Sequence, residues 1–198
     1  MKELANAEEM TISATYQGDL MNCESKFFSF AIAAFIALVS FSSARAALPV
    51  DPRTIPQIDF TKYSGLWKEI AHSPNYFQVS CLRSTAEYKL IGPGKVSVHN
   101  ICYKAGTEIS DIRGVATVSN PRAPGKLKVK FDHIPVAGDY WVVELDPNYQ
   151  WAVVSGPGRK SLFILSRTTP LKSSLRYPLL RKLKQKGFDT SSLIFDKW

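Results

Sequence analysis

The amino-acid sequence predicts an all-β protein, an eight-stranded antiparallel up-and-down β-barrel with one C-terminal α-helix packed on its outside. Three observations predict this fold. Short segments of strand-like composition follow one another from Gly65 to Arg167, and turns rich in glycine and proline separate them. After Arg167 the spacing of apolar residues changes from the strand period to the helix period. A long meander must bury its dry face and hide its edges, and closure into a barrel does both.

The alternation is clearest in the segment KLKVKF, where Leu127, Val129 and Phe131 share one face and three lysines share the other. Short turns such as Gly92–Gly94 and Gly156–Gly158 make consecutive strands antiparallel. The expected strands are Leu66–Ala71, Ser84–Leu90, Lys95–Tyr103, Ile112–Ser119, Lys126–Phe131, Asp139–Leu145, Trp151–Val154 and Ser161–Arg167.

The helix is predicted from Leu179, Leu180 and Leu183, which share one helical face. Gly187 is a natural C-cap, and Pro178 is expected in the first turn, where its missing N–H does no harm. The segment Ser192–Phe195 could form a last short strand.

The N-terminal part has the pattern of an export signal. Lys26 precedes the apolar run Phe27–Val39, which is followed by the cleavage pattern Ala44-Arg45-Ala46. The run is shorter than the ~20 apolar residues of a membrane span. We therefore expect a disordered upstream extension at 1–20, a signal peptide at 21–46 and the barrel domain at 47–198. No cysteine lies just after the apolar run, so we expect a periplasmic or secreted protein without a lipid anchor, which could associate with the outer membrane.

Charge and cysteines fit an exported domain. The chain has 25 basic and 17 acidic residues, of which the first 46 residues hold three and five, so the remainder has a net charge of +10. This charge favours solubility or attraction to an anionic membrane surface, and a nucleic-acid partner is not expected. Cys81 and Cys102 are expected to form a disulfide. Pairing about the turn at Pro93 puts Cys102 opposite Ser84, close to Cys81.

Three motifs carry a family resemblance. They are Gly65-Leu66-Trp67, Asp146-Pro147-Asn148-Tyr149 and Arg167 after the last expected barrel strand. With these motifs in this order, the chain from about Phe60 to Phe195 resembles the lipocalins, especially the bacterial outer-membrane lipocalins that also resemble apolipoprotein D. The resemblance implies that Trp67 closes the bottom of the barrel and that Arg167 packs across it. Structural roles are therefore expected for Gly65, Trp67, Asp146, Tyr149 and Arg167.

Strand parity then predicts the interior. With Trp67 inside, Glu69 and Ala71 should also point inward, and the same argument places Glu144 inside with Tyr140 and Val142. Glu69 and Glu144 would either form a satisfied hydrogen-bond network, which we favour, or orient a ligand. The loop Ser73–Ser80 would lie across the open mouth, with Tyr76 and Phe77 either as a lid or as anchors on the rim. The expected ligand-binding residues are Tyr76, Phe77, Tyr88, Val98, Asn100, Phe131, Tyr140, Val142 and Phe163.

No pattern in the sequence indicates catalysis. Ser155 lacks the glycine of a nucleophile elbow, the three histidines (His72, His99, His133) are scattered, and a disulfide would remove both cysteines as nucleophiles. We therefore expect no catalytic residues, no metal site and no cofactor. The favoured function is binding and carrying or sequestering a small hydrophobic ligand, most simply a fatty acid or lysophospholipid. The alternatives are a lipid- or isoprenoid-modifying enzyme and a surface-interaction protein with a filled barrel.

Overall fold

A computed structural model describes residues 51–198 of the chain. The expected extension at 1–20, the signal peptide at 21–46 and the start of the domain at residue 47 lie outside the described residues. In the described part of the chain, no helix combines the length and the apolarity that a membrane span requires.

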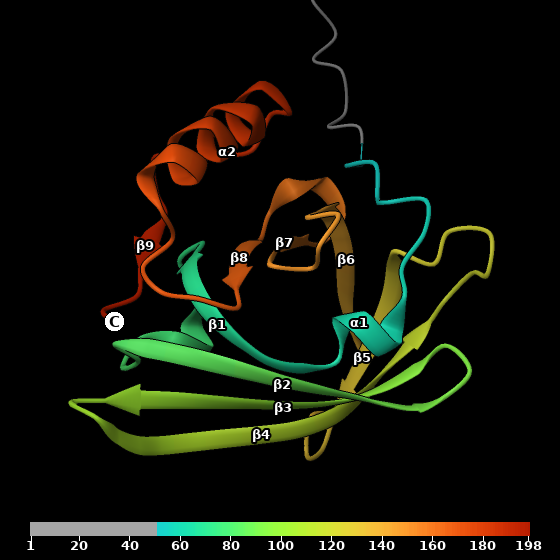
Figure 1. Cartoon of the computed structure of the whole chain (residues 1–198). Helices are drawn as coiled ribbons and strands as arrows, with labels where there is room; N and C mark the ends of the chain where they lie inside the picture. Colours follow the sequence, from blue (N-terminus) through green and yellow to red (C-terminus); the bar gives the residue numbers. More distant parts are fainter. Residues whose placement is uncertain (1–50) are drawn as a thin grey trace, which may run out of the picture. The chain divides into compact units, whose positions relative to one another are not determined.

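Eight antiparallel strands close into a barrel, as predicted (Figure 1). Each strand pairs with its neighbour in sequence, and β1 pairs with both β2 and β8, which closes the sheet. The strands are β1 Gly65–His72, β2 Arg83–Gly92, β3 Lys95–Lys104, β4 Thr107–Val118, β5 Lys126–Phe131, β6 Gly138–Leu145, β7 Trp151–Ser155 and β8 Leu162–Ser166. A ninth strand, β9 Ile194–Phe195, pairs with the C-terminal end of β1 and lies within the segment expected to form a last strand.

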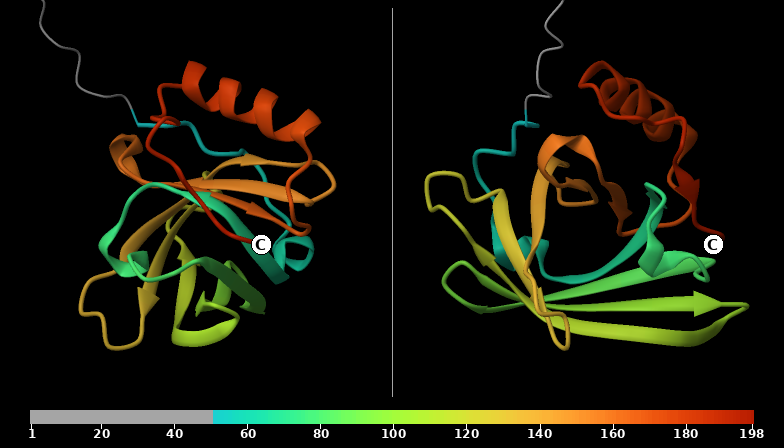
Figure 2. Two further views of the ribbon diagram at one scale, coloured as in Figure 1. Left: turned by 90° about the vertical axis from the view of Figure 1, so that its left-hand side faces the viewer. Right: turned by 180° about the vertical axis from the view of Figure 1, so that it is seen from behind.

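The helix α2 (Ser173–Gln185) lies outside the barrel (Figure 2). It packs through Leu179 and Leu183 on the outward-facing residues of β1, β6, β7 and β8. Gly187 adopts φ 83° and ends the helix, as predicted. The expected position of Pro178 in the first turn is wrong, because the helix begins five residues earlier and Pro178 lies inside it.

Three short helical turns complete the fold. The helix α1 (Phe60–Tyr63) precedes β1 and lies at the closed end of the barrel, where Asp59 caps it. The 3₁₀ turns η1 (Tyr76–Gln78) and η2 (Pro157–Arg159) lie in the loops after β1 and β7, at the opposite, open end.

Two β-bulges reverse the strand parity and correct two predictions. On β1 the register shifts between Glu69 and Ala71, and Ala71 packs with the outer cluster under α2 instead of facing inward. On β6 the register shifts between Val142 and Glu144, so Glu144 faces outward toward α2. Each bulge adds one residue to one strand, and every side chain beyond it changes face.

The closed end of the barrel is built around Trp67 and Arg167. Trp67 is fully buried, and its Nε1 donates to the carbonyl of Tyr63. The guanidinium carbon of Arg167 lies 3.8 Å from the centre of the indole ring. Gly65 has φ +98°, and a Cβ there would lie 3.3 Å from the Arg167 guanidinium, so this position suits glycine.

Arg167 also holds the start of the domain. Its guanidinium donates hydrogen bonds to the carbonyls of four residues around α1 and the start of β1, namely Lys62, Tyr63, Ser64 and Leu66. The β6–β7 turn is fixed beside it, because Asp146 accepts from two backbone N–H groups and the Tyr149 hydroxyl accepts from the N–H of Asp59. The three motif regions therefore meet at one end of the barrel.

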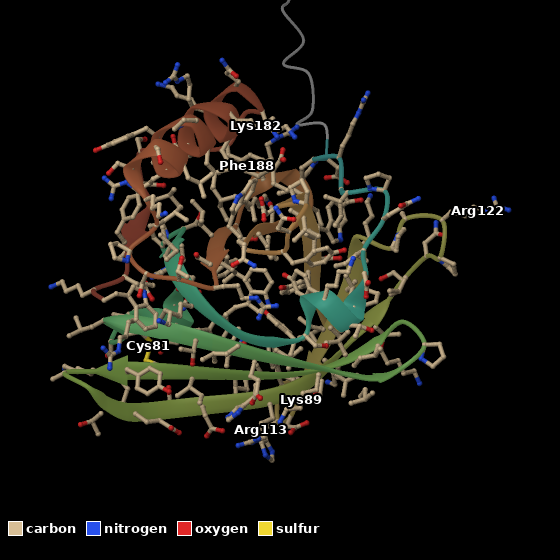
Figure 3. All side chains as sticks on the ribbon, viewed as in Figure 1. Cys81, Lys89, Arg113, Arg122, Lys182 and Phe188 are labelled. Atoms are coloured by element: carbon tan, nitrogen blue, oxygen red, sulfur yellow. A yellow bond between two sulfur atoms is a disulfide. The ribbon has the colours of Figure 1, made fainter. Side chains whose placement is uncertain are left out.

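The disulfide between Cys81 and Cys102 is present, as predicted, with a Cα–Cα distance of 5.4 Å. Ser84 pairs with Cys102, which confirms the predicted register of β2 and β3. Figure 3 shows the bond beside Cys81, at the end of the barrel where β2 begins. The bridge fixes the loop after β1 to β3.

We expect Arg167→Ala and Trp67→Ala to destabilise the fold strongly. Loss of the buried indole should cost about 3–5 kcal/mol, and loss of the guanidinium leaves several carbonyls without their donor. Urea unfolding followed by circular dichroism measures both. Arg122→Ala is the control, because Arg122 extends into solvent from the β4–β5 loop (Figure 3). Unfolding midpoints of the Trp67 and Arg167 variants equal to that of the control would contradict the assignment.

We expect Glu144→Gln to lower the free energy of unfolding at neutral pH, where Glu144 is charged, and to have little effect at acidic pH. Burial alone would raise the pKa of Glu144, but Lys182 and Lys186 of α2 hold it below its ordinary value of 4.5. A lowered folded-state pKa means that the interaction stabilises above about pH 4.5 and is lost as the pH falls further. Glu144→Gln should therefore cost roughly 1–3 kcal/mol at pH 7 and much less at pH 3. Urea unfolding of both proteins at the two pH values is the measurement, and an equal difference at both would argue against the contact.

Candidate functional site

The interior of the barrel has an apolar wall. Val98, Val142, Phe131 and Phe163, four of the residues expected to contact a ligand, belong to the inner cluster. Val98 and Val142 are buried, whereas Phe131 and Phe163 are partly accessible. The buried residues of this cluster are Tyr63, Trp67, Ala86, Tyr88, Val96, Val98, Ala116, Leu127, Val129, Val142, Ala152, Val154 and Leu165.

A chain of three tyrosine hydroxyls crosses the interior above Trp67. Tyr140 donates to Tyr88 at 3.0 Å, and the hydroxyls of Tyr63 and Tyr140 lie 2.6 Å apart. The ring centres of Tyr63 and Trp67 are 5.0 Å apart, so the chain stands directly on the floor of the barrel. The structure thus brings Tyr88 and Tyr140 together, as strand parity predicted, and adds Tyr63 from α1.

The tyrosine chain has one hydroxyl proton that it does not use internally. Three hydroxyls carry three protons, and the two hydrogen bonds among them use two. Burial raises the pKa values of Tyr63, Tyr88 and Tyr140 above the ordinary value of 10, so all three remain protonated at neutral pH. One O–H therefore remains to donate, and the other two bonds polarise it.

Asn100 supplies a second polar group. It pairs with Ala86 across β2 and β3, one inward position nearer the open end than the Tyr88–Val98 pair. Its Oδ1 is buried and has no hydrogen-bond partner among the described residues. A buried amide oxygen without a donor is costly, so a ligand that bonds to it gains affinity.

The open end carries the loop between β1 and β2. Gln78 reaches inward from η1 and donates to Glu69 at 2.8 Å and to Ser84 at 3.1 Å. Asn75 accepts from the Gln78 backbone N–H and so fixes the turn. Glu69 therefore faces the interior, as predicted, and takes part in a hydrogen-bond network.

Tyr76 and Phe77 lie on this loop but do not pack on the barrel rim. Their exposed fractions are 89% and 82%, and the two rings meet edge to face. Gln78 and Asn75, rather than the two aromatic side chains, hold the loop on the barrel. Tyr76 and Phe77 thus present an apolar surface to whatever approaches the open end.

Sequence reasoning missed three residues of the interior. Tyr63 lies before the first expected strand, at the end of the short helix α1, so strand parity could not place it. His72 is buried beside Glu69, since it pairs with the inward-facing Phe163 beyond the bulge in β1. Asp196 approaches Glu69 from the C-terminal tail, and no local pattern signals this contact.

The outer wall has an open depression of about 190 Å³ on β2, β3 and β4. Its rim includes Lys89 and Arg113, both labelled in Figure 3, and the His99 ring bonds to Asp111 beside it. These charged groups suit water better than an apolar ligand. The apolar wall and the unpartnered Asn100 oxygen make the interior the candidate site for a hydrophobic molecule.

Comparisons with known proteins agree with this geometry. Residues 58–197 match the family model described as a lipocalin-like domain. The chain is 37% identical to temperature-induced lipocalin-1 of Arabidopsis thaliana over 144 residues, which cover 69% of this chain and 77% of that protein. It is 34% identical to the outer membrane lipoprotein Blc of Vibrio cholerae over 150 residues, which cover 75% and 87%.

The solved structure of insecticyanin from the tobacco hornworm Manduca sexta shares the fold. Its TM-score is 0.60 at 24% identity, and the match covers 75% of this chain and 84% of that one. Barrel topology, the floor built from three motifs and the family model agree. The chain therefore belongs to the lipocalin family, whose members mostly bind small hydrophobic ligands.

Proposed function

We propose that this protein carries or sequesters a lipid with a single acyl chain, a fatty acid or a lysophospholipid, inside the barrel. The observation that carries the proposal is that the apolar wall holds two unused polar groups, the spare O–H of the tyrosine chain and, one inward position from Tyr88, the unpartnered Asn100 oxygen. A molecule with one polar end and one apolar chain matches these groups. A wholly apolar ligand would leave both polar groups without a partner.

Magnitudes assign different tasks to the two parts of the site. Each CH₂ that the wall removes from water contributes about 0.8 kcal/mol, whereas one hydrogen bond nets about 0.5–1.5 kcal/mol. The acyl chain should therefore set the affinity. The tyrosine hydroxyls and Asn100 should set which polar head is accepted.

We favour binding over catalysis. Both cysteines of the domain are joined in the disulfide, so neither is available as a nucleophile. The disulfide also supports an extracytoplasmic location, periplasmic or secreted. The relative from Vibrio cholerae is named as an outer membrane lipoprotein, which fits that location.

Contact with an anionic membrane surface is a further part of this proposal. Arg181 and Lys184 are exposed on α2, and Tyr76, Phe77 and Val79 are exposed at the open end. The cationic residues would be attracted to anionic lipid head groups, and the apolar residues would contact the membrane. The open end of the barrel would then lie close to the source of its ligand.

We expect Phe131→Glu to abolish acyl-chain binding, because it places a carboxylate in the apolar wall. The measurement is displacement of a fluorescent fatty acid by a series of fatty acids of increasing length. Val115→Glu is the matched control, since this substitution adds the same charge on the outer face of the neighbouring strand β4. The proposal fails if the wild-type protein binds no acyl chain of any length, or if Phe131→Glu folds and binds like the control.

We expect Tyr140→Phe to change the preference for the polar head. The substitution removes the central hydroxyl and separates the other two, while the apolar wall remains. The ranking of fatty acid against lysophospholipid of equal chain length should change by about 3–10-fold, as one hydrogen bond predicts. The dependence on chain length should stay the same. An unchanged ranking would exclude the tyrosine chain as the head-group site.

A further inference from the structure

A cluster of three metal-binding side chains lies at the open end of the barrel. Glu69 and His72 come from β1, and Asp196 follows β9. One ligand atom from each residue lies within 4.8 Å of the others. Glu69 and His72 are 7% and 2% exposed, so this is not a solvated group of surface acids.

The C-terminal tail builds the cluster. Phe195 and Ile194 pair with Ala71 and His72, and the N–H of Asp196 donates to the carbonyl of Ile70. Trp198 then donates from its indole N–H to the carbonyl of Glu69. These contacts place Asp196 beside a residue 127 positions earlier in the chain.

The two carboxylates lack a compensating cation. Glu69 contacts the Gln78 amide and the His72 ring, and Asp196 accepts from the Ser84 N–H at 2.6 Å. Among the described residues, no lysine or arginine forms an ion pair with either carboxylate. Glu69 is buried, and a carboxylate oxygen of Asp196 lies within 4.8 Å of a carboxylate oxygen of Glu69. Such a pair is a poor structural contact unless a positive charge lies between its members.

The histidine is oriented as metal ligands are. Its Nδ1 lies 2.9 Å from the carbonyl of Ser73, to which it can only donate. Asn75 Nδ2 also lies 3.2 Å from this nitrogen, but its two N–H groups bond to the Ser73 carbonyl and to Gln78 Oε1. A proton on Nδ1 fits these contacts, and it leaves the lone pair on Nε2, which lies 3.9 Å from Glu69 Oε1. Gln78 and the Ser84 N–H each hold one oxygen of a carboxylate, as outer-shell donors do in metal sites.

We propose that Glu69, His72 and Asp196 bind a divalent transition-metal ion of the zinc class. One imidazole and two carboxylates are ordinary zinc ligands, and a fourth position would take water. Tetrahedral ligands about 2.0–2.1 Å from zinc lie about 3.4 Å from each other, so each ligand atom needs to move by less than about 1 Å. The ion would tie the C-terminal strand to β1 and, through Gln78, to the loop with Tyr76 and Phe77. The proposal does not rest on lipid binding.

The experiment uses the full chain, freed of metal with a chelator and titrated with zinc chloride by calorimetry. Metal content after dialysis gives the stoichiometry. We expect one zinc per chain and an unfolding temperature that rises with zinc concentration. His72→Ala and Asp196→Asn should each weaken binding at least 100-fold and remove the thermal shift. Asp196→Asn keeps an oxygen for the Ser84 N–H, so this variant should fold.

His99→Ala is the matched control. His99 bonds to Asp111 at 2.7 Å on the outer wall, so it tests whether any histidine next to a carboxylate suffices. It should bind zinc like the wild type. The visible spectrum of the Co²⁺ protein provides a second readout, and it should show tetrahedral coordination that Glu69→Gln abolishes. If folded His72→Ala and Asp196→Asn proteins bind zinc as the wild type does, or if His99→Ala removes the binding, the site does not exist.

Discussion

The contact of the Arg167 guanidinium with the Trp67 indole is the interaction on which the rest of the barrel depends. A barrel that holds a ligand must be closed at one end by something other than the ligand. Here the indole fills the end, and the guanidinium covers it while donating to the carbonyls of Lys62 in α1 and of Leu66 at the start of β1. Since Arg167 directly follows β8, the same residue also joins the last barrel strand to the first. Tyr63 is held in this assembly, and the tyrosine chain above it begins from a fixed point.

The two bulges decide what each side chain is used for. Glu69 and His72 are three residues apart, so on a regular strand without the bulge they would face opposite sides of the sheet. The extra residue puts both on the inner side and turns Ala71 out toward α2. In β6 the bulge works in the opposite sense, since it turns Glu144 out of the interior. There it meets Lys182 and Lys186 of α2, and a charge that would have been costly inside the barrel attaches the helix to its wall.

Much of this structure follows from local sequence patterns. Alternation, turn residues and the helix period predict the barrel and the helix, because these features depend on neighbours in the chain. Seven of the eight strands are predicted to within two residues, whereas β4 begins five residues before its expected start. The family motifs place Trp67 and Arg167 at the floor. Parity fails only beyond the bulges, at Ala71 and Glu144, because nothing local marks where an extra residue enters a strand. The position of Asp196 could not be predicted for another reason. The two-residue strand β9 brings it to β1, and so short a strand has no recognisable sequence pattern.

The polar groups of the interior are divided between its two ends. Near the floor are neutral hydroxyls, which an apolar wall tolerates because they bond to one another and keep one donor in reserve. Near the mouth are carboxylates, whose burial is costly and which are held by an amide, a backbone N–H and the histidine. A lipid with its head at the tyrosines and its tail toward the mouth would bring methylenes toward the carboxylates. A cation that neutralised the carboxylates would lower the cost of this arrangement. The proposed metal site and the proposed acyl-chain site are therefore compatible, although each rests on its own residues.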